Sequence, residues 1–341
     1  MRSTLFALLA ALAAACPLSA QPATPSERHA PKPIAELRTR DAIILGSIVG
    51  LLEYLPVSSL GHAMVADHFL GLEDGTQLRD ERGDPLWARP PGPRHPLGEP
   101  LSIKVAADTF AVVTQIGAIL AVGFLFRSRF AELIRGIAGR SDAGRRLSVN
   151  LAVAFLPAGI VGFLLNRWIL AHLFTNGVFI AAQLAGAAFM VFAEVWKKRR
   201  PAPDPLFDGS RLPVSSALGI GLLQCVSFWP GMSRSMTTII GGYFAGMDGR
   251  RSGEFSFLLG FFTLSAASIY KSLQSGPAMI AVFGWSHVIL GCAVATVTAM
   301  LAVKLFLDYL TRHGLAIFAI YRVAFAIILS ILALKSATGI G

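Results

Sequence analysis

Polar residues gather at two points of an otherwise apolar chain. The first, LPVSSLGH at Leu55–His62, has two serines and a histidine after a proline, and Glu53 precedes it. Ser58 and Ser59 lie four and three residues before His62, a spacing that places side chains on one face of a helix. A helix that begins at these serines has free backbone N–H groups at its positive end, which favours binding of an anion.

The second point, PGMSRS at Pro230–Ser235, places Ser233 and Ser235 after a proline and adds the guanidinium of Arg234. Arginine can bind a phosphate through two hydrogen bonds, and its cost inside an apolar segment favours a functional role. If the two points meet, they supply anion binding, a nucleophile, an acid or base, and positive charge. Phosphoryl-group hydrolysis requires this set of groups.

Purely structural roles compete with this interpretation. Serines that follow a proline are often plain helix caps, so Ser58 and Ser235 are equally well interpreted as caps or as site residues. A single histidine in a membrane segment is often structural, although Glu53 and Ser59 nearby favour a functional His62. Glu53 could simply pair with Arg234, but that pair would itself belong to the site.

The composition indicates an all-α polytopic membrane protein. The chain has 341 residues, a mean hydropathy of +0.61, 54% hydrophobic residues and only 15% charged residues, too few for a soluble protein of this size. The net charge of +10 does not indicate a nucleic-acid partner, because Lys and Arg fall mostly between apolar segments. The three cysteines lack metal-ligand spacing, so we expect neither a zinc site nor a disulfide framework.

The N-terminal segment MRSTLFALLAALAAACPLSA, residues 1–20, has the pattern of a secretory signal peptide. An uncleaved first helix is the alternative. We expect residues 21–40 to be an unstructured segment outside the cytoplasm.

The apolar segments predict six transmembrane helices and two re-entrant pairs of broken helices. Segments 41–55 and 58–70 form the first pair and 214–228 and 233–245 the second, because each is too short to cross a bilayer core of about 30 Å. The arginine-rich loops 127–146 and 197–211 are expected in the cytoplasm. The six predicted spans are 110–126, 149–165, 178–196, 255–273, 287–306 and 318–333.

The second half of the sequence repeats the first. GLLE at Gly50–Glu53 matches GLLQ at Gly221–Gln224, and each is followed by a proline and a serine cluster. We predict two inverted-topology repeats, 41–200 and 212–341, joined by a cytoplasmic linker at 201–211. Broken helices at the interface of such repeats are where polar ligands bind. The first pair enters from outside, so the predicted site faces the periplasm from a bacterial inner membrane.

At these residues the chain resembles the BacA/UppP family of undecaprenyl-diphosphatases. The family signature EGLTEFLPVSSTGH corresponds to VGLLEYLPVSSLGH at Val49–His62, and PGTSRSGATI corresponds to PGMSRSMTTI at Pro230–Ile239. The resemblance runs in family order from about residue 41 to the end of the chain. Further matches are FAVVTQIGAILAV at Phe110–Val122, FLPAGIVG at Phe155–Gly162, EFSFLL at Glu254–Leu259 and FAIYRV at Phe318–Val323.

The resemblance implies removal of the terminal phosphate from undecaprenyl diphosphate, which regenerates the lipid carrier for cell-wall synthesis, and bacitracin resistance on overexpression. It also implies a divalent cation, Mg²⁺ or Ca²⁺, with Glu53 as a metal ligand. Either Ser59 or His62 would be the nucleophile. The implied catalytic residues are Glu53, Ser59, His62 and Arg234, and the implied phosphate-binding residues are Ser58, Ser233, Arg234 and Ser235.

The chain also departs from the family pattern. Val49 stands where the family has a glutamate that is often given a metal or catalytic role, so the cation requirement is in question. Leu60, Met236 and Phe262 replace a family threonine, glycine and proline, respectively. These departures suggest a divergent member. The partners that we expect are a polyprenyl diphosphate lipid, the membrane and a second copy of the chain.

Two other functions compete. A flippase for polyprenyl phosphate would use the same inverted repeats with weak or no phosphatase activity. The PAP2-type lipid phosphatases require a histidine five residues after a Ser-Arg pair, but the sequence after Arg234 is SMTTIIGG. That family is therefore disfavoured.

Overall fold

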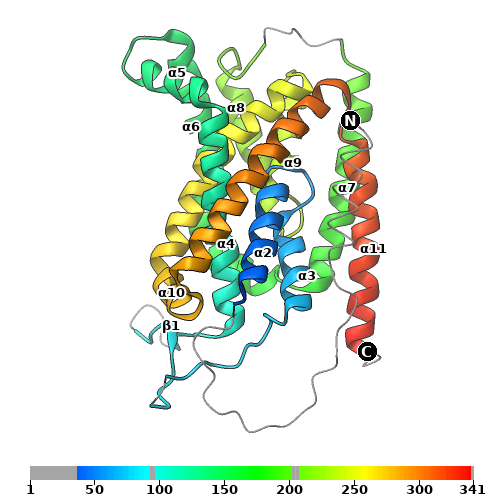
Figure 1. Ribbon diagram of the computed structural model, residues 1–341. Coiled ribbons are helices and arrows are strands. Elements are labelled where there is room, and N and C mark those ends of the chain that lie inside the picture. Colours follow the sequence, from blue (N-terminus) through cyan, green and yellow to red (C-terminus); the bar gives the residue numbers. More distant parts are fainter. Residues whose placement is uncertain (1–36, 81, 93–96, 202–203, 205–206, 339–341) are drawn as a thin grey trace. The chain divides into compact units, whose positions relative to one another are not determined.

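The computed structural model describes residues 37–338, except 81, 93–96, 202–203 and 205–206 (Figure 1). The predicted signal peptide and most of the predicted extracytoplasmic segment lie outside this range. The described chain is mostly helical, as expected. Its helices are α2 (Thr39–Leu52), α3 (Ser59–Leu70), α4 (Ile103–Leu125), α5 (Arg127–Ile137), α6 (Asp142–His172), α7 (Asn176–Lys198), α8 (Val214–Cys225), α9 (Arg234–Phe244), α10 (Gly249–Arg312) and α11 (Ala316–Thr338).

Two minor elements complete the description. The short 3₁₀ helix η1 (Val226–Phe228) extends α8, and the strands β1 (Trp87–Arg89) and β2 (Glu99–Pro100) pair antiparallel. Both strands lie in the long polar segment between α3 and α4.

Five of the described helices are long and apolar enough to cross a membrane: α4, α6, α7, α10 and α11. α10 has 64 residues, and at Gly284 its backbone is non-helical, with φ 73° and ψ 155°. Two helices therefore meet at Gly284, where the chain turns back near the α10 label in Figure 1. The predicted spans 255–273 and 287–306 lie on either side of this turn.

The predicted loop at 127–146 was partly wrong. Residues 127–137 form the helix α5, and Ser141 caps α6 by accepting a hydrogen bond from the Gly144 N–H at 3.0 Å. α5 carries arginines yet leaves Ile134 and Ile137 largely exposed. A short helix with both features suits the surface of a bilayer. The arginine count predicted the location of the segment but not its helical structure.

The described chain forms two compact units, and each takes residues from both predicted repeats. Unit 1 comprises residues 37–50, 62–118 and 264–298, and unit 2 comprises 51–61, 119–263 and 299–338.

In unit 1, two glycines one helical turn apart let α2 approach α10 closely. A Cβ atom at Gly46 would lie 2.6 Å from the carbonyl oxygen of Gly291, and one at Gly50 would collide with Thr298 and Ala295. Small residues at this spacing are a common way to pack helices in membranes, where burial against lipid gives little driving force. Residues 291–298 of α10 are therefore a packing surface for α2.

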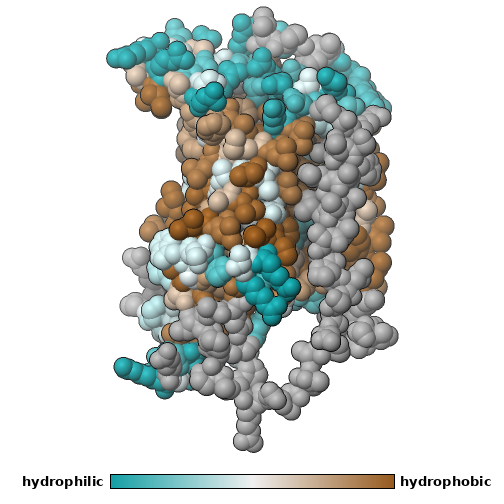
Figure 2. All heavy atoms as spheres, viewed as in Figure 1, coloured by the Kyte–Doolittle hydropathy of each residue, from teal (hydrophilic) through white to brown (hydrophobic). Residues whose placement is uncertain are grey.

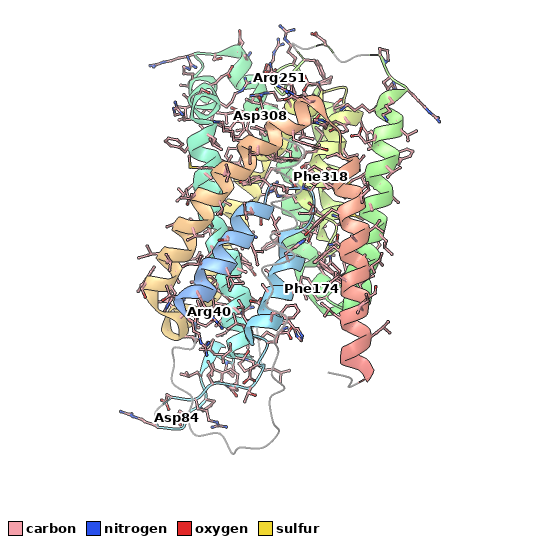
Figure 3. All side chains as sticks on the ribbon, turned by 45° about the vertical axis from the view of Figure 1, so that its right-hand side comes forward. Arg40, Asp84, Phe174, Arg251, Asp308 and Phe318 are labelled. Atoms are coloured by element: carbon pink, nitrogen blue, oxygen red, sulfur yellow. The ribbon has the colours of Figure 1, made fainter. Side chains whose placement is uncertain are left out.

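In unit 2, α6 packs against α5 and α8, and α7 packs against α9 and α11. At the end of this unit that includes α5, Arg129 binds the carboxylates of Glu132, Asp208 and Glu254 at 3.2 to 3.4 Å. Hydrophilic residues gather around α5, and hydrophobic residues cover the helices beyond it (Figure 2). Arg251 and Asp308 lie at the same end, whereas Phe174 lies toward the opposite one (Figure 3).

Candidate functional site

Both predicted breaks are present in unit 2, and they share one unusual backbone feature. α2 ends at Leu52 and α3 begins at Ser59, while η1 ends at Phe228 and α9 begins at Arg234. The residue before each new helix, Ser58 or Ser233, has a φ of 70°. No other non-glycine residue in the described chain has a positive φ.

A left-handed serine of this kind costs on the order of 1–3 kcal/mol and persists only where its surroundings hold it. The two serines occupy equivalent positions in the two motifs, VSS and MSRS. The sequence repeat is thus matched by a repeated backbone conformation at both breaks. Ser233 also caps α9, because its Oγ accepts a hydrogen bond from the Met236 N–H at 3.4 Å.

The carboxylate of Glu53 lies between a hydroxyl and a guanidinium. The Oγ of Ser59 donates a hydrogen bond to Glu53 Oε2 at 2.7 Å. On the other side, Nη2 of Arg234 lies 3.8 Å from Glu53 Oε1. The side chains of Arg234 and Glu53 are only 12% and 6% exposed. A buried carboxylate in contact with a serine hydroxyl can accept the proton of that hydroxyl, which would make Ser59 a nucleophile.

Arg234 has few strong partners for a buried cation. Its Nη groups donate to the carbonyl oxygens of Ser256 and Glu53 at 3.4 and 3.5 Å, and the guanidinium lies 5.4 Å from the centre of the Tyr54 ring. Its buried Nε has no hydrogen-bond partner in the described chain. A Cβ atom at Gly260 would collide with this guanidinium. The space around Arg234 is therefore kept by a glycine, and a donor remains available for an anion.

Ser233 and Ser235 connect the two breaks. The Ser235 hydroxyl donates to the carbonyl oxygen of Leu55 at 2.8 Å, and the Ser233 hydroxyl lies 3.1 Å from that of Ser235. Ser235 is only 1% exposed. These contacts join the second break to the backbone of the first, so the two polar motifs meet as expected. The predicted roles of both serines in phosphate binding stay predictions.

Arg322 in α11 is a residue whose place at the site was not predicted. It is fully buried, and its guanidinium donates hydrogen bonds to five carbonyl oxygens. Two acceptors, in Ala182 and Gln183, belong to α7. The other acceptors are the carbonyls of Pro56 in the first break and of Gly231 and Met232 in the second, at 3.4, 2.7 and 3.3 Å.

Backbone carbonyls freed by a broken helix need donors, because none is available in lipid. Arg322 supplies donors to both breaks at once. A Cβ atom at Gly186 would collide with its guanidinium. The available sequence signal was an arginine inside a long apolar span, which is costly unless it has internal partners.

Unit 2 thus brings together Glu53, Ser59 and Arg234, with Ser233 and Ser235 beside them. Ser58 is buried in the first break and gives it its left-handed turn. His62 lies in α3, three residues after Ser59, and is half-buried. It belongs to unit 1, so its participation in the site stays a prediction.

The residues of the site do not form a complete metal centre. Within the described ranges, no group of three or more His, Cys, Asp or Glu side chains is placed to hold a metal ion. Glu53 faces a guanidinium, and Val49 is buried, clustering with Ala63 and Ala111 in unit 1. The predicted metal role of Glu53 was not tested by this geometry.

Comparison with known proteins agrees with the motifs. A family model described as "Bacitracin resistance protein BacA" matches residues 95–328. The undecaprenyl-diphosphatase of Sorangium cellulosum is 38% identical over 286 residues, which cover 83% of each chain. Undecaprenyl-diphosphatase 1 of Burkholderia lata is 35% identical, covering 84% of this chain and 92% of that protein.

A third relative agrees with these two. The undecaprenyl-diphosphatase of Geobacillus thermodenitrificans is 34% identical over 290 residues, covering 84% of this chain and 95% of its own length. The family match covers more than half of this chain, and the relatives cover most of it. The chain therefore belongs to the BacA family.

Proposed function

We propose that this protein is a membrane phosphatase that hydrolyses undecaprenyl diphosphate to undecaprenyl phosphate and inorganic phosphate. The relatives that match this chain over most of their own length are named undecaprenyl-diphosphatases. The structural observation that carries the proposal is the hydrogen bond from the Ser59 hydroxyl to Glu53, a buried carboxylate that also lies beside Arg234. Its product is the carrier lipid needed for cell-wall synthesis, and bacitracin resistance is associated with the family.

The chemical steps follow from this cluster. Ser59 Oγ attacks the terminal phosphorus while Glu53 accepts its proton, and the bond from that phosphorus to the bridging oxygen breaks. The lipid leaves as the monophosphate, and a phosphoserine forms. Water then attacks the phosphoserine, the proton held by Glu53 returns to Ser59 Oγ as the phosphoserine bond breaks, and His62, left neutral by the first step, accepts the proton of the water, which releases phosphate and restores the starting state. We assign protonation of the leaving group to His62, one helical turn from Ser59.

Positive charge for the transition state comes from Arg234 and from the start of α3 and α9. The unpartnered Nε of Arg234 and its long contacts to carbonyl oxygens leave donors for phosphate oxygens. The N–H groups at the start of a helix add partial positive charge. Charges fixed in a buried site stabilise a developing anion more strongly than charges in water.

A divalent cation remains part of the proposal. The site offers a single carboxylate, and Mg²⁺ is commonly held by one or two carboxylates together with substrate phosphates. We therefore expect the cation to enter with the diphosphate, and no step above depends on it.

The finer architecture also belongs to this proposal. We infer two inverted repeats with six spans and two re-entrant pairs in a bacterial inner membrane, with the site open to the periplasm. The arginine-rich segments near 127–146 and 197–211 support this orientation by the positive-inside rule. A homodimer stays a prediction.

The test is phosphate release from a polyprenyl diphosphate by the purified protein in detergent, with Mg²⁺, Ca²⁺ or EDTA. Ser59→Ala and Arg234→Ala should abolish release, whereas Ser148→Ala should retain it, because Ser148 only bonds to its own helix at Gly144. No release from folded wild-type protein with any cation would refute the phosphatase. The polyprenyl-phosphate flippase would then be tested by lipid transfer across vesicles.

A further inference from the structure

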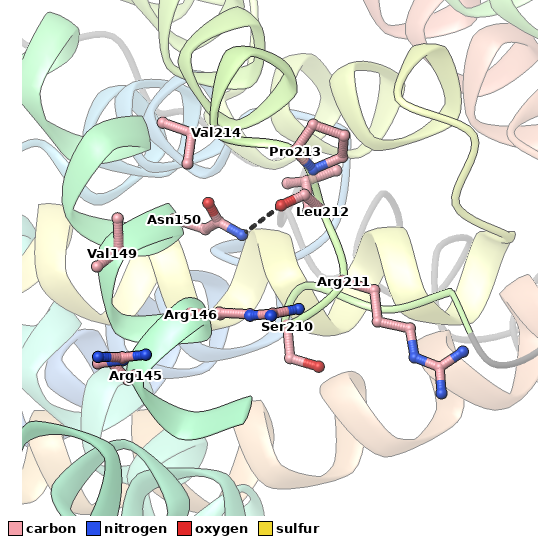
Figure 4. A pocket seen from close by; sticks show the side chains of 9 residues that line it. All are labelled: Arg145, Arg146, Val149, Asn150, Ser210, Arg211, Leu212, Pro213 and Val214. Carbon is pink, nitrogen blue, oxygen red and sulfur yellow. Dashed lines mark hydrogen bonds between the residues drawn. The ribbon is translucent and has the colours of Figure 1, made fainter. Parts of the chain in front are cut away.

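A second polar feature of unit 2 lies apart from Glu53, Ser59 and Arg234. A cavity of about 550 Å³ opens between the start of α6 and the segment 210–214 that leads into α8. We call it the basic cavity, because three of its nine lining residues are Arg145, Arg146 and Arg211. In Figure 4 the Arg146 side chain extends toward Ser210, whereas the Arg211 side chain points away from the other residues.

The cationic charge in this cavity is only partly neutralised. Arg145 lies 3.1 Å from Asp142, but both side chains are mostly exposed, so the pair is weak. Within the described chain, neither Arg146 nor Arg211 forms a salt bridge. The nearest acid along the lining segment, Asp208, accepts a hydrogen bond from the Ser210 hydroxyl at 2.6 Å and pairs with Arg129. The cavity therefore keeps an excess of positive charge.

The walls of the cavity are held in place before any ligand arrives. The Asn150 amide donates hydrogen bonds to the carbonyl oxygens of Gly209 and Leu212 at 2.9 and 2.8 Å. These bonds fix the segment before α8 against α6. Pro213, at the N-cap of α8, provides no side-chain cap, so N–H groups of the first turn of α8 are left without an intrahelical acceptor.

The edge of the cavity is apolar. Val149 and Val214 line it and are 45% and 52% exposed. Exposed apolar side chains beside unpaired arginines mark the level where hydrocarbon meets the lipid headgroups. The arginines belong to the segments that the positive-inside rule assigns to the cytoplasm.

We propose that the basic cavity binds a phosphate group, supplied by the headgroup of an anionic phospholipid in the adjacent leaflet. Arg146 binds the phosphate, Arg145 adds charge, and Val149 and Val214 contact the start of the acyl chains. Free inorganic phosphate has the same chemistry and is the other source to be distinguished. The proposal does not depend on the function proposed for the site at Ser59.

The experiment is native mass spectrometry of the full chain in detergent, titrated with phosphatidylglycerol or with phosphatidylcholine. The variants are Arg146→Gln and the double variant Arg145→Gln/Arg146→Gln. Arg140→Gln is the matched control, because Arg140 is exposed in the same basic segment but does not line the cavity. Each lining arginine should contribute roughly five-fold in affinity, since a basic residue near an anionic membrane contributes about 1 kcal/mol.

Phosphatidylglycerol should bind wild-type protein and the control alike, and the double variant roughly 25-fold more weakly. Inorganic phosphate that binds with the same dependence on Arg146, while phosphatidylglycerol does not, would keep the anion site but assign it a soluble ligand. Equal binding of both lipids, or equal losses in Arg140→Gln and Arg146→Gln, would overturn the proposal. Unfolding temperatures measured beside the titrations show that every variant is folded.

Discussion

At the scale of single residues, the short contact between Ser59 and Glu53 is the most informative geometry in the site. At 2.7 Å it supports the proposal that Glu53 receives the serine proton. We expect Glu53→Gln to lower kcat by about 10²–10⁴-fold, the usual contribution of a general base. The amide keeps the size of the side chain but cannot accept a proton at neutral pH.

Phosphate release at saturating substrate measures this effect, with Glu132→Gln as the control. Glu132 is also a partly buried carboxylate bound to an arginine, but it lies in α5, outside the polar site. A Glu53→Gln enzyme with nearly wild-type kcat would remove Glu53 from the proton transfer and leave His62 as the base.

Val49 gives the clearest test of the cation requirement. It is 2% exposed and lies four residues before Glu53, where the family has a glutamate. We expect Val49→Glu to lower the unfolding temperature in EDTA, because a buried carboxylate without a partner is costly. Mg²⁺ should restore that temperature and raise phosphatase activity.

The control is Val49→Gln, which adds the same bulk without the charge. Its unfolding temperature should not respond to Mg²⁺. A Val49→Glu protein that is equally insensitive to Mg²⁺ would show that no cation site can be rebuilt beside Glu53.

Asp208 predicts how stability depends on pH. Burial would raise the pKa of Asp208, but hydrogen bonds from Ser210 and the charges of Arg129 and Arg251 outweigh it, so the pKa is lowered. A lowered folded-state pKa stabilises the protein above the unfolded pKa of about 4, and that contribution disappears as the pH falls through the folded value.

Asp208→Asn should therefore unfold at a lower temperature than wild type by a constant margin between about pH 5 and 8. The margin should shrink below about pH 4, where the wild-type carboxylate becomes protonated. Thermal unfolding in detergent across this range measures it, with the exposed Asp142→Asn as control. A margin independent of pH down to the lowest value would contradict the assigned cause.

At the scale of elements, the two breaks depend on Arg322. Its five carbonyl acceptors come from both breaks and from α7. Arg322→Lys keeps the charge but has one nitrogen where the guanidinium has three, so several buried carbonyls lose their donor at about 1–3 kcal/mol each. We expect a clear fall in unfolding temperature and a fall in kcat of at least about ten-fold, while KM changes less.

A structural role alone would lower the unfolding temperature but leave kcat of the folded fraction unchanged. The control Arg127→Lys alters an arginine outside both breaks, whose side chain donates a long hydrogen bond of 3.5 Å to the Phe124 carbonyl oxygen. An unchanged kcat in folded Arg322→Lys would limit Arg322 to stabilising the fold.

The sequence predicted those elements whose length is set by the thickness of the bilayer. Long apolar runs predicted the spans, and short runs ending at Pro56 and Pro230 predicted both breaks. α5 was missed because its arginines suggested a loop, although residues 127–137 form a helix. The two spans predicted at 255–273 and 287–306 lie on either side of the turn at Gly284, where the backbone is non-helical.

The candidate site was also predictable only in part. Glu53, Ser59 and Arg234 were identifiable because their chemistry is unusual in an apolar segment. The partners of Arg322 were not, because they are backbone carbonyls from three separate elements. Ser235 shows the same limit, since its hydroxyl binds the carbonyl of Leu55, a contact that depends on the fold rather than on spacing.

At the scale of the whole molecule, the charge distribution predicts the orientation in the membrane. The segment around α5 is rich in arginine, and the long segment between α3 and α4, which contains Asp84, is polar with mixed charge. The positive-inside rule places the first in the cytoplasm and the second in the periplasm. Arg140, just after α5, and Asp84, in the segment between α3 and α4, are both exposed, so a cysteine at either position can report the side of the membrane.

We expect a cysteine introduced as Asp84→Cys to react with a membrane-impermeant maleimide on cells whose outer membrane is opened. Arg140→Cys should react only after the inner membrane is also permeabilised. Cys16 and the half-buried Cys225 and Cys292 are first changed to alanine, so that only the reporter reacts. The reverse pattern would place the start of α6, with its arginines, outside the cell. It would then contradict both the periplasmic site and the leaflet assigned to the basic cavity, because a single inversion of the chain reverses both.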